Sequence, residues 1–396
     1  MANTILTPTA VTREALRILH QKLNFIGNVN RQYDDSFSKT GAKIGDTLKI
    51  RLPNQYTVRT GATLSAQDTT ESSTSLQIAT QKGVDVNFTS AELTLSLDDF
   101  SQRILEPAMA VLAANIEADA FAMALDVYNV VNNVGSAITF NKVMTARKAL
   151  NDNLAPMDNN RSIILNTQDN VDLVDALKGL FQDSAAISKQ YRDGMMGRTG
   201  GFDFYENTLL PSQTTGTAAS ATTYTVNGAG QTGSTVTVAT GATTFKKGDS
   251  ITFAGCNRVH PETKVDTGVL QQFVVTADYA GGAGNLAISP AIVTSGATQN
   301  VSGSPTNGGA VTKVGAASSI YKPSLAFHKD AFTFATADLI DVTQFGAWGA
   351  REVMDGISMR IARQYDITND KFPCRLDVLY GYKTIRPQLA ARILSN

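Results

Sequence analysis

The sequence predicts an α+β protein of more than one domain, in which a long helix carries separate β-structures. Three observations predict this class: a helical apolar period at 96–133, strand-like alternation at 47–88, and a Thr-, Gly- and Val-rich stretch without helical period at 218–315. The chain has 396 residues, enough for about two or three domains. Hydrophobic residues make up 42% of it, which is sufficient for buried cores.

The long helix is expected to begin at Ser96 and to end near Asn133. Ser96 is a suitable N-cap, and Asp98 and Asp99 face the positive end of the helix dipole. Apolar side chains then recur at helical spacing, at Phe100, Ile104, Ala108, Leu112, Ile116, Phe121, Leu125 and Tyr128. Pro107 removes one backbone hydrogen bond, so we expect a bend there. At ~1.5 Å per residue the helix is about 50 Å long, which suits a spine.

An arm and a hairpin are expected before this spine helix. Residues 1–46 form the arm, with a short helix at 12–23. Residues 47–56 and 74–88 each alternate apolar and polar side chains, and a polar stretch lies between them. The pattern predicts a long two-stranded hairpin with a broad tip. Because two isolated strands are only marginally stable in water, the hairpin should lie against another surface.

A small α/β domain with an inserted β-module is expected after the spine. Residues 142–153 form a helix, and a buried strand at 161–166 leads into a second helix that Asn166 caps. The module spans 218–315, with turn signals about every 10 residues, as in small barrels and sandwiches. Its alternating aliphatic residues argue against a disordered linker. Six short strands can be placed in it, at 223–226, 234–238, 249–253, 271–276, 285–289 and 310–314.

The end of the chain is expected to return to the spine helix as a sheet. Residues 325–336 are strand-like, and 351–367 contain an alternating apolar pattern. A polar turn at 368–371 then leads to a second alternating strand at 374–382. The two strands would make a hairpin whose apolar face packs on the spine helix.

No catalytic, cofactor-binding or metal site is predicted. His20, His260 and His328 are not near a second histidine or a cysteine at metal-ligand spacing. Cys256 and Cys374 give no disulfide framework, and the phosphate-loop, dinucleotide-binding and nucleophile-elbow motifs are absent. A net charge of −1 argues against a dedicated nucleic-acid binder. Neither a signal peptide nor a membrane span is expected.

The order of these elements, together with local motifs, resembles one known family. The motifs are Asn166-Thr167-Gln168-Asp169, Tyr191-Arg192-Asp193-Gly194, Gly201-Phe202-Asp203, the stretch from Lys247 to Gly255, and Tyr380-Gly381 followed by Arg386-Pro387. The chain resembles the major capsid proteins of tailed bacteriophages, which have the Hong Kong 97 fold. Within them it is similar to the coat proteins of short-tailed phages that contain an inserted I-domain.

This resemblance implies domain names and a structural function. It implies an N-arm at 1–46, an E-loop at 47–88, a peripheral domain at 89–139 and 350–396, an axial domain at 140–217 and 316–349, and an I-domain at 218–315. Subunits of the family form pentamers and hexamers, assemble with a scaffolding protein into a procapsid, and expand as double-stranded DNA is packaged. The implied partners are further copies of the chain, scaffolding protein, portal protein and DNA bound without sequence specificity. The resemblance does not determine whether a decoration protein also binds. The implied location is the virion capsid, and the host cytoplasm during assembly.

The resemblance also directs attention to particular residues. A shell that changes shape needs joints, and Pro107 with Gly194, Gly197, Gly200 and Gly201 are candidate hinges. The relatives have an acidic N-arm helix that contacts basic scaffolding protein, whereas the helix here is basic. We therefore expect Arg13 and Arg17 to contact scaffolding protein of the opposite charge. The I-domain loop that contains carboxylates in the relatives corresponds to 226–233, which has none.

Two other classes of protein remain as alternatives. A tail-tube or fibre subunit would suit the β-module and the Thr-rich composition, but not a long central helix. A soluble hydrolase would have to use His328, next to Lys329 and Asp330. Because adjacent residues of a strand face opposite ways, a polar group at a strand end is the simpler interpretation.

Overall fold

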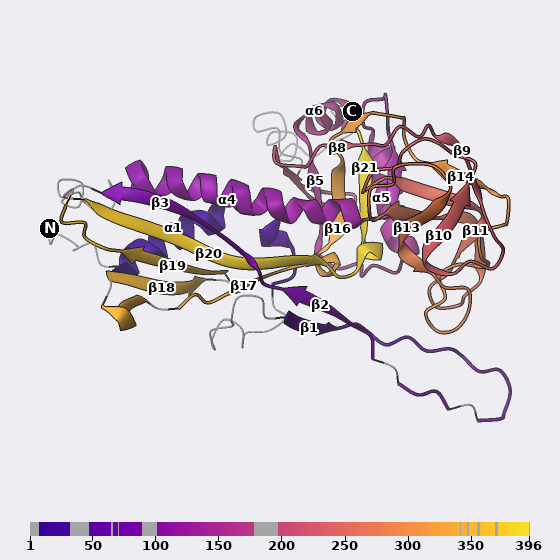
Figure 1. Cartoon of the computed structure of the whole chain (residues 1–396), viewed down its shortest axis with the longest axis horizontal. Helices are drawn as coiled ribbons and strands as arrows, with labels where there is room; N and C mark the ends of the chain where they lie inside the picture. The colour runs from indigo at the N-terminus through magenta and orange to yellow at the C-terminus, as the bar shows by residue number, and fades with distance from the viewer. Residues whose placement is uncertain are drawn as a thin grey trace. The chain divides into compact units, whose positions relative to one another are not determined.

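The computed structural model describes residues 8–31, 47–64, 66–69, 71–88, 101–177, 197–340, 342–346, 348–354, 357–368 and 371–395. The fold is α+β, as predicted (Figure 1). The chain divides into two compact units, and it passes between them several times. Unit 1 comprises 1–51, 73–121 and 332–385, and unit 2 comprises 52–72, 122–331 and 386–396.

Unit 1 is built on a five-stranded antiparallel sheet. Its central strand is β20 (Phe372–Thr384), which pairs with β3 (Thr80–Phe88) along one side and with β17 (Phe332–Ala337) and β19 (Ile357–Arg363) along the other. Strand β18 (Trp348–Met354) pairs with β19. The predicted hairpin at the end of the chain is confirmed, because β19 and β20 pair in register from Arg360 opposite Asp377.

Two helices cover this sheet. Helix α1 (Pro8–Lys22) packs against β18, β19 and α4 (Glu106–Phe121), and α4 also contacts β3. The spine helix is continued at both ends in other forms, as a π-helical turn at Ser101–Leu105 and a 3-10 turn at Ala122–Asp126. The proposed cap Ser96 lies outside the described residues.

The predicted end of the spine helix near Asn133 is wrong. The helix stops at Asp126, and residues Val130–Asn132 form strand β4. Apolar residues continue past Asp126 because β4 is buried in a sheet, and a short apolar run does not distinguish helix from strand. Pro107 lies in the first turn of α4, directly after the π-helical turn. The first turn of a helix tolerates a missing N–H well.

The predicted hairpin over 47–88 is correct only in its first part. Strands β1 (Thr47–Arg51) and β2 (Ser73–Gln77) pair in register, but β3 belongs to the five-stranded sheet. Ile78, at the point of separation, is fully buried against Leu379 and its neighbours. Alternation in β2 and β3 correctly indicated strands, but it does not identify which strand each one pairs with.

Unit 2 contains a six-stranded sheet of order β4-β21-β16-β5-β7-β6. Helix α5 (Phe140–Asp152) packs on it, and α6 (Thr167–Leu177) follows β5. The predicted strand at 161–166 is confirmed as β5 (Arg161–Leu165), and every one of its residues is buried. The other strands are β6 (Arg198–Thr199), β7 (Phe202–Glu206), β16 (Ser324–His328) and β21 (Ala390–Leu394).

The last part of the chain contributes strands to the sheets of both units. The strand-like stretch 325–336 is broken by a 3-10 turn at Lys329–Ala331, so β16 lies in unit 2 and β17 in unit 1. The terminal strand β21 pairs with β16 and β4 in unit 2 and does not join the sheet of unit 1. Apolar patterning within one strand does not specify which strand it pairs with.

The second part of unit 2 is a closed six-stranded barrel of order β10-β13-β12-β11-β14-β9 (Figure 1). All six strands predicted in the β-module are confirmed, and their inward side chains form one core. The chain enters and leaves through the paired short strands β8 (Gln213–Thr214) and β15 (Ile320–Tyr321). The strands are β9 (Ala221–Val226), β10 (Gly233–Ala239), β11 (Ser250–Val259), β12 (Asp266–Val275), β13 (Gly284–Ile292) and β14 (Ala310–Lys313).

Candidate functional site

The loop 52–72, which closes the β1–β2 hairpin, exposes large apolar side chains. Val58 is 93% exposed and Leu64 is 82% exposed, and Tyr56 is also mostly exposed. The described part of this loop has no helix or strand. Exposed apolar side chains gathered on one segment are typical of a surface that another protein covers.

A side-chain clip holds the two limbs of this loop together. The amide oxygen of Gln67 accepts hydrogen bonds from the Thr57 backbone N–H and from its hydroxyl, both at 2.9 Å. The amide nitrogen of Gln67 donates to the Thr57 carbonyl at 2.6 Å. Gln67 therefore replaces the backbone pairing of a strand. This role cannot be predicted from the sequence, because the polar stretch around Gln67 contains no motif that indicates it.

The basic residues of α1 are paired within unit 1. Arg17 donates two hydrogen bonds to the Glu14 carboxylate, at 2.6 and 3.0 Å, and this pairing raises the pKa of Arg17. Arg13 lies 3.3 Å from Glu352 of β18, and Lys22 lies 3.6 Å from Glu106. The basic face of α1 is therefore less available than its composition suggested.

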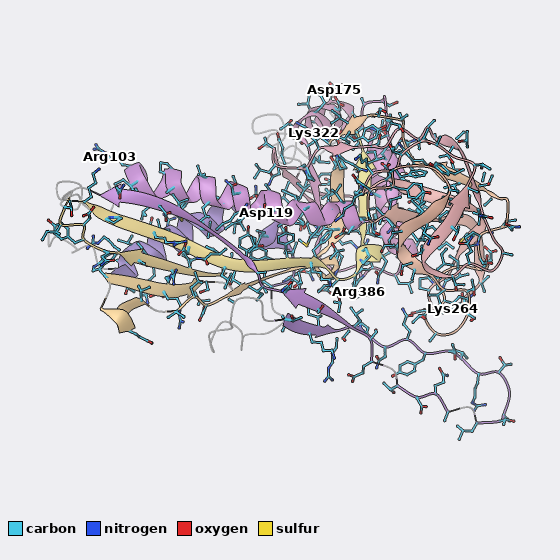
Figure 2. The ribbon with its side chains drawn as sticks, in the orientation of Figure 1. Arg103, Asp119, Asp175, Lys264, Lys322 and Arg386 are labelled. Carbon is cyan, nitrogen blue, oxygen red and sulfur yellow. The ribbon has the colours of Figure 1, made fainter. Side chains whose placement is uncertain are left out.

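Carboxylates of the spine helix tie the surrounding elements to it. Asp119 of α4 is labelled in Figure 2. It accepts a hydrogen bond from the Tyr380 hydroxyl at 2.5 Å and pairs with Lys82 at 2.7 Å. Glu117 is buried and accepts a hydrogen bond from the backbone N–H of Phe25. These contacts connect the arm, β3 and β20 with the helix.

The candidate hinge glycines have clear local positions. Gly200 and Gly201 have φ angles of 59° and 83°, and they join β6 to β7, in which Thr199 pairs with Phe202. Two consecutive positive φ angles are those of a tight type I′ hairpin turn. Gly197 also has a positive φ, of 61°. Gly194 lies outside the described residues.

Two sequence motifs form tight caps and turns. The backbone N–H of Asp169 donates to the Asn166 side chain at 2.7 Å, and the Asn166 amide donates to the Asp169 carboxylate at 2.9 Å. Asn166 therefore caps the N-terminus of α6, and the Asp169 carboxylate holds its side chain in place. The Ser324 hydroxyl of β16 also donates to Asp169. At the turn before β11, Asp249 accepts hydrogen bonds from the backbone N–H groups of Lys246 and Gly216, at 2.9 and 3.0 Å.

The residues that carry reactive chemistry occupy structural positions. His328 is buried and lies 3.1 Å from Asp158, with the Asp330 N–H donating to its other ring nitrogen. Burial raises the pKa of both Cys256 and Cys374 to about 12, so neither thiol is activated. Within the described ranges, no group of three or more histidine, cysteine, aspartate or glutamate side chains is placed to hold a metal ion.

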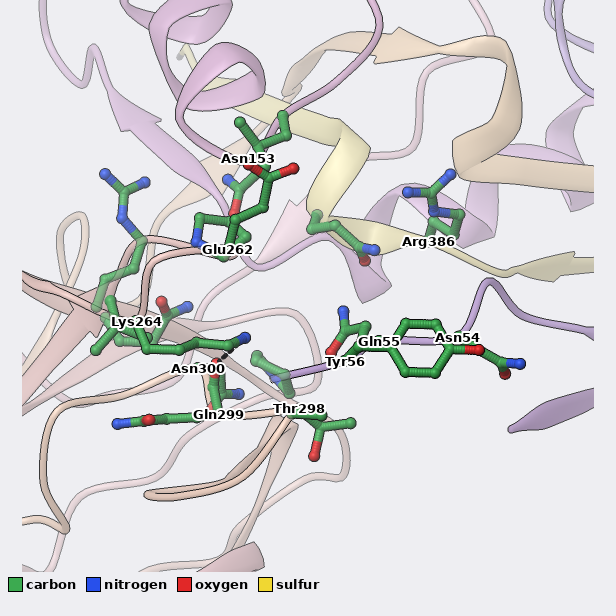
Figure 3. Close-up of a pocket in the computed structure, with 18 of the residues that line it drawn as sticks. Asn54, Gln55, Tyr56, Asn153, Glu262, Lys264, Thr298, Gln299, Asn300 and Arg386 are labelled. Atoms are coloured by element: carbon green, nitrogen blue, oxygen red, sulfur yellow. Dashed lines mark hydrogen bonds between the residues drawn. The ribbon is translucent and has the colours of Figure 1, made fainter. Parts of the chain in front are cut away.

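A cleft of about 660 Å³ in unit 2 is mainly polar in character (Figure 3). Its lining includes Asn54, Tyr56, Lys264 and Arg386, and Lys264 donates to the carbonyl of Gln299 at 3.2 Å. Glu262 is the one carboxylate among the lining residues, which include no histidine or cysteine. Among its lining residues there is therefore no serine or cysteine nucleophile with a histidine base.

One helix among the described residues is long and apolar enough to cross a membrane. It spans Arg103–Asp126, and half of its most apolar window is buried inside the protein. Helix α1 and strand β3 pack against this segment. We attribute its composition to that packing, since the central helix of a protein core is equally apolar.

Comparison with known proteins gives a family for almost the whole chain. A sequence model described as P22 coat protein, gene protein 5, matches residues 29–394. No curated protein matched the chain. Among solved structures, a Mycobacterium phage Che8 chain is similar at 14% identity and a TM-score of 0.48, covering 94% of this chain and 90% of that one. A Ralstonia phage GP4 capsid chain is similar at 9% identity and a TM-score of 0.46, with the same coverage.

Proposed function

The chain belongs to the P22 coat protein family and is a major capsid protein, and on that premise we propose how its surfaces build the shell. Subunits assemble through pentamers and hexamers into an icosahedral shell that encloses double-stranded DNA. The loop 52–72 provides the contact between neighbours within these rings. It is the observation that supports this proposal best, because Val58 and Leu64 project almost fully into solvent.

The physical reason is the cost of leaving this loop uncovered. Covering a fully exposed Val or Leu side chain is worth roughly 1.5–3 kcal/mol. The Gln67 clip already holds the two limbs together, so less conformational freedom is lost when a neighbour binds. A second copy of the chain is the natural cover, because repeated identical contacts close a symmetric ring.

Further partners follow from the family. We propose that the chain co-assembles with a scaffolding protein and a portal protein in the host cytoplasm, and that the shell expands as DNA enters. The low net charge of −1 suits a wall that holds DNA without many fixed phosphate contacts. We propose no catalytic activity. The match to a family of coat proteins, whose function is structural, supports that assignment.

Scaffolding contact is proposed at Arg13 and Arg17, on the exposed side of α1. Replacing both by Glu should reduce procapsid yield, because the exposed surface of the helix changes sign. The replacement also breaks the pairs with Glu352 and Glu14, so thermal unfolding of the unassembled variant should show that it still folds. Replacing both by Lys is the matched control and should preserve the yield. Equal yields from the two variants would remove these residues from the scaffolding contact.

The joint for expansion is proposed at Pro107, at the change from π-helical to α-helical hydrogen bonding. Such π-helical turns frequently mark functional sites. The glycines 194–201 are kept as a second candidate. Comparing backbone angles at these positions in procapsids and expanded shells tests both, and unchanged angles would exclude them.

The experiment that tests the assembly proposal is a loop substitution. We expect Val58→Asp combined with Leu64→Asp to abolish shell formation, scored by electron microscopy and sedimentation, while circular dichroism stays that of the unsubstituted chain. Val171→Asp is the matched control, since Val171 is 62% exposed on α6. Normal shells from the loop variant would refute the proposed role of the loop.

A further inference from the structure

The barrel of unit 2 is joined to the six-stranded sheet through a fully buried arginine. Arg392 of β21 donates hydrogen bonds to the Val127 carbonyl at 3.0 Å, the Gln213 side-chain oxygen at 2.7 Å and the Gly248 carbonyl at 2.8 Å. These acceptors lie after the spine helix, on the strand that enters the barrel, and on the turn before β11. One side chain therefore connects three segments that are far apart in the sequence.

The negative charges of Asp249 and Asp126 offset the positive charge of this arginine. Burial lowers the pKa of Arg392 to about 10, against the opposing influence of Asp249 and Asp126, so the guanidinium remains charged at neutral pH. Lys313 of β14 is also buried, and its ammonium donates to the carbonyls of Gly216 and Ala218. Burial lowers the pKa of Lys313, and Asp249 again opposes the shift.

Asp249 thus serves two buried cations from the barrel turn. One of its carboxylate oxygens accepts two backbone hydrogen bonds. The other is buried and has no hydrogen-bond partner among the residues the structure describes. A buried carboxylate with an unsatisfied oxygen is costly, and nearby positive charge is what makes it tolerable here. The cluster of Asp249, Lys313 and Arg392 is therefore interdependent.

Further contacts surround this cluster. The Gln272 side chain of β12 accepts a hydrogen bond from the Val130 N–H at 2.7 Å and donates to the Val130 carbonyl at 3.0 Å. It pairs with β4 as a strand would, and so covers an edge of the sheet. Arg258 of β11 pairs with Asp152 of α5 at 2.9 Å.

We propose that the barrel and the six-stranded sheet form one rigid body locked by Arg392, so that the barrel does not swing when the shell changes shape. Moving the barrel would separate a buried guanidinium from its acceptors, and leaving a buried charge uncompensated is strongly unfavourable. Any movement that accompanies expansion must then occur outside this joint. The contacts of Arg392 all lie within one chain, so they can be tested without assembly of the shell.

The test is the unfolding of the unassembled chain, followed by calorimetry and by hydrogen exchange read with mass spectrometry. We expect barrel strands and sheet strands to lose protection in a single transition. Arg392→Met should separate this into two transitions. Arg161→Met is the matched control: Arg161 is a buried arginine of the same sheet, but its three hydrogen bonds go to Asn151, Ala155 and Pro156 and to none of the acceptors of Arg392. It should lower the transition temperature without splitting the transition.

Two results would overturn the proposal. One is separate transitions of barrel and sheet in the unsubstituted chain, and the other is a single transition in Arg392→Met. If Arg392→Met fails to fold, Gln272→Ala replaces it, and we expect exchange of the Val130 amide to become about tenfold faster, as for the loss of one net hydrogen bond. Unchanged exchange would count against the joint. In shells imaged before and after expansion, a barrel rotated relative to its sheet would also contradict the proposal.

Discussion

Gly83 is a position at which we expect one added methyl group to destabilise the fold. This residue of β3 lies beside Asp377 of β20, and a Cβ at position 83 would approach the Asp377 carboxylate and the Leu376 carbonyl more closely than real Cβ atoms do. Asp377 is buried and bonds Arg360 and Arg375, each at 2.8 Å. Replacing glycine by alanine in a strand ordinarily stabilises it by roughly 0.5–1 kcal/mol. We expect the opposite sign here.

The size of the effect follows from what must move. Because one of the two obstacles is backbone, rotating the Asp377 side chain does not relieve the contact, and β3 has to shift away from β20. Overpacking of this kind costs about 1–3 kcal/mol. Disturbing the buried pair of Asp377 with Arg360 adds to that cost. We therefore expect Gly83→Ala to lower the free energy of unfolding by about 2–4 kcal/mol.

The assay is urea unfolding of the unassembled chain, followed by circular dichroism. Gly27→Ala is the matched control in unit 1, since an added Cβ at Gly27 meets nothing within 4 Å and the residue has no positive φ. It should leave the free energy of unfolding unchanged or slightly raised. A Gly83→Ala chain as stable as the control would refute the close packing of β3 on β20.

Three further predictions concern the loop, the thiols and a buried carboxylate. Gln67→Ala should slow shell assembly, measured by light scattering, without changing the transition temperature of the single chain, because the clip shapes only the loop; an unchanged rate would show that the clip does not matter. Cys256 and Cys374 should resist a thiol reagent at pH 8 until the chain is unfolded, because a pKa of about 12 leaves only about one thiolate in ten thousand; rapid labelling of the folded chain would contradict their burial. Burial raises the pKa of Asp169 above its unfolded value of about 3.9, so the folded chain binds the proton more tightly and this group's contribution to stability falls as pH rises from about 4 through the folded pKa. Asp169→Asn should remove that slope from urea midpoints measured between pH 4 and 7, and an unchanged slope would assign it to other groups.

The sequence by itself identified the elements whose patterns are local. The barrel strands were placed correctly because inward residues such as Val236 and Val238 alternate within one short strand. The N-cap of α6 by Asn166 was likewise predicted, since its partner Asp169 lies within one helical turn. The family resemblance rested on the same kind of local motif and on the order of elements, and it led to the correct protein class.

Only the tertiary structure decided which elements pair and which charges are buried. Strand β3 joins β20 instead of completing a long hairpin, and β21 joins the sheet of unit 2, because the choice of partner depends on contacts between residues far apart in the chain. The same reason hides the roles of Arg392 and Gln67. A charged or amide side chain is expected at the surface from its type alone, and its burial or bridging role arises only when distant backbone carbonyls and N–H groups converge on it.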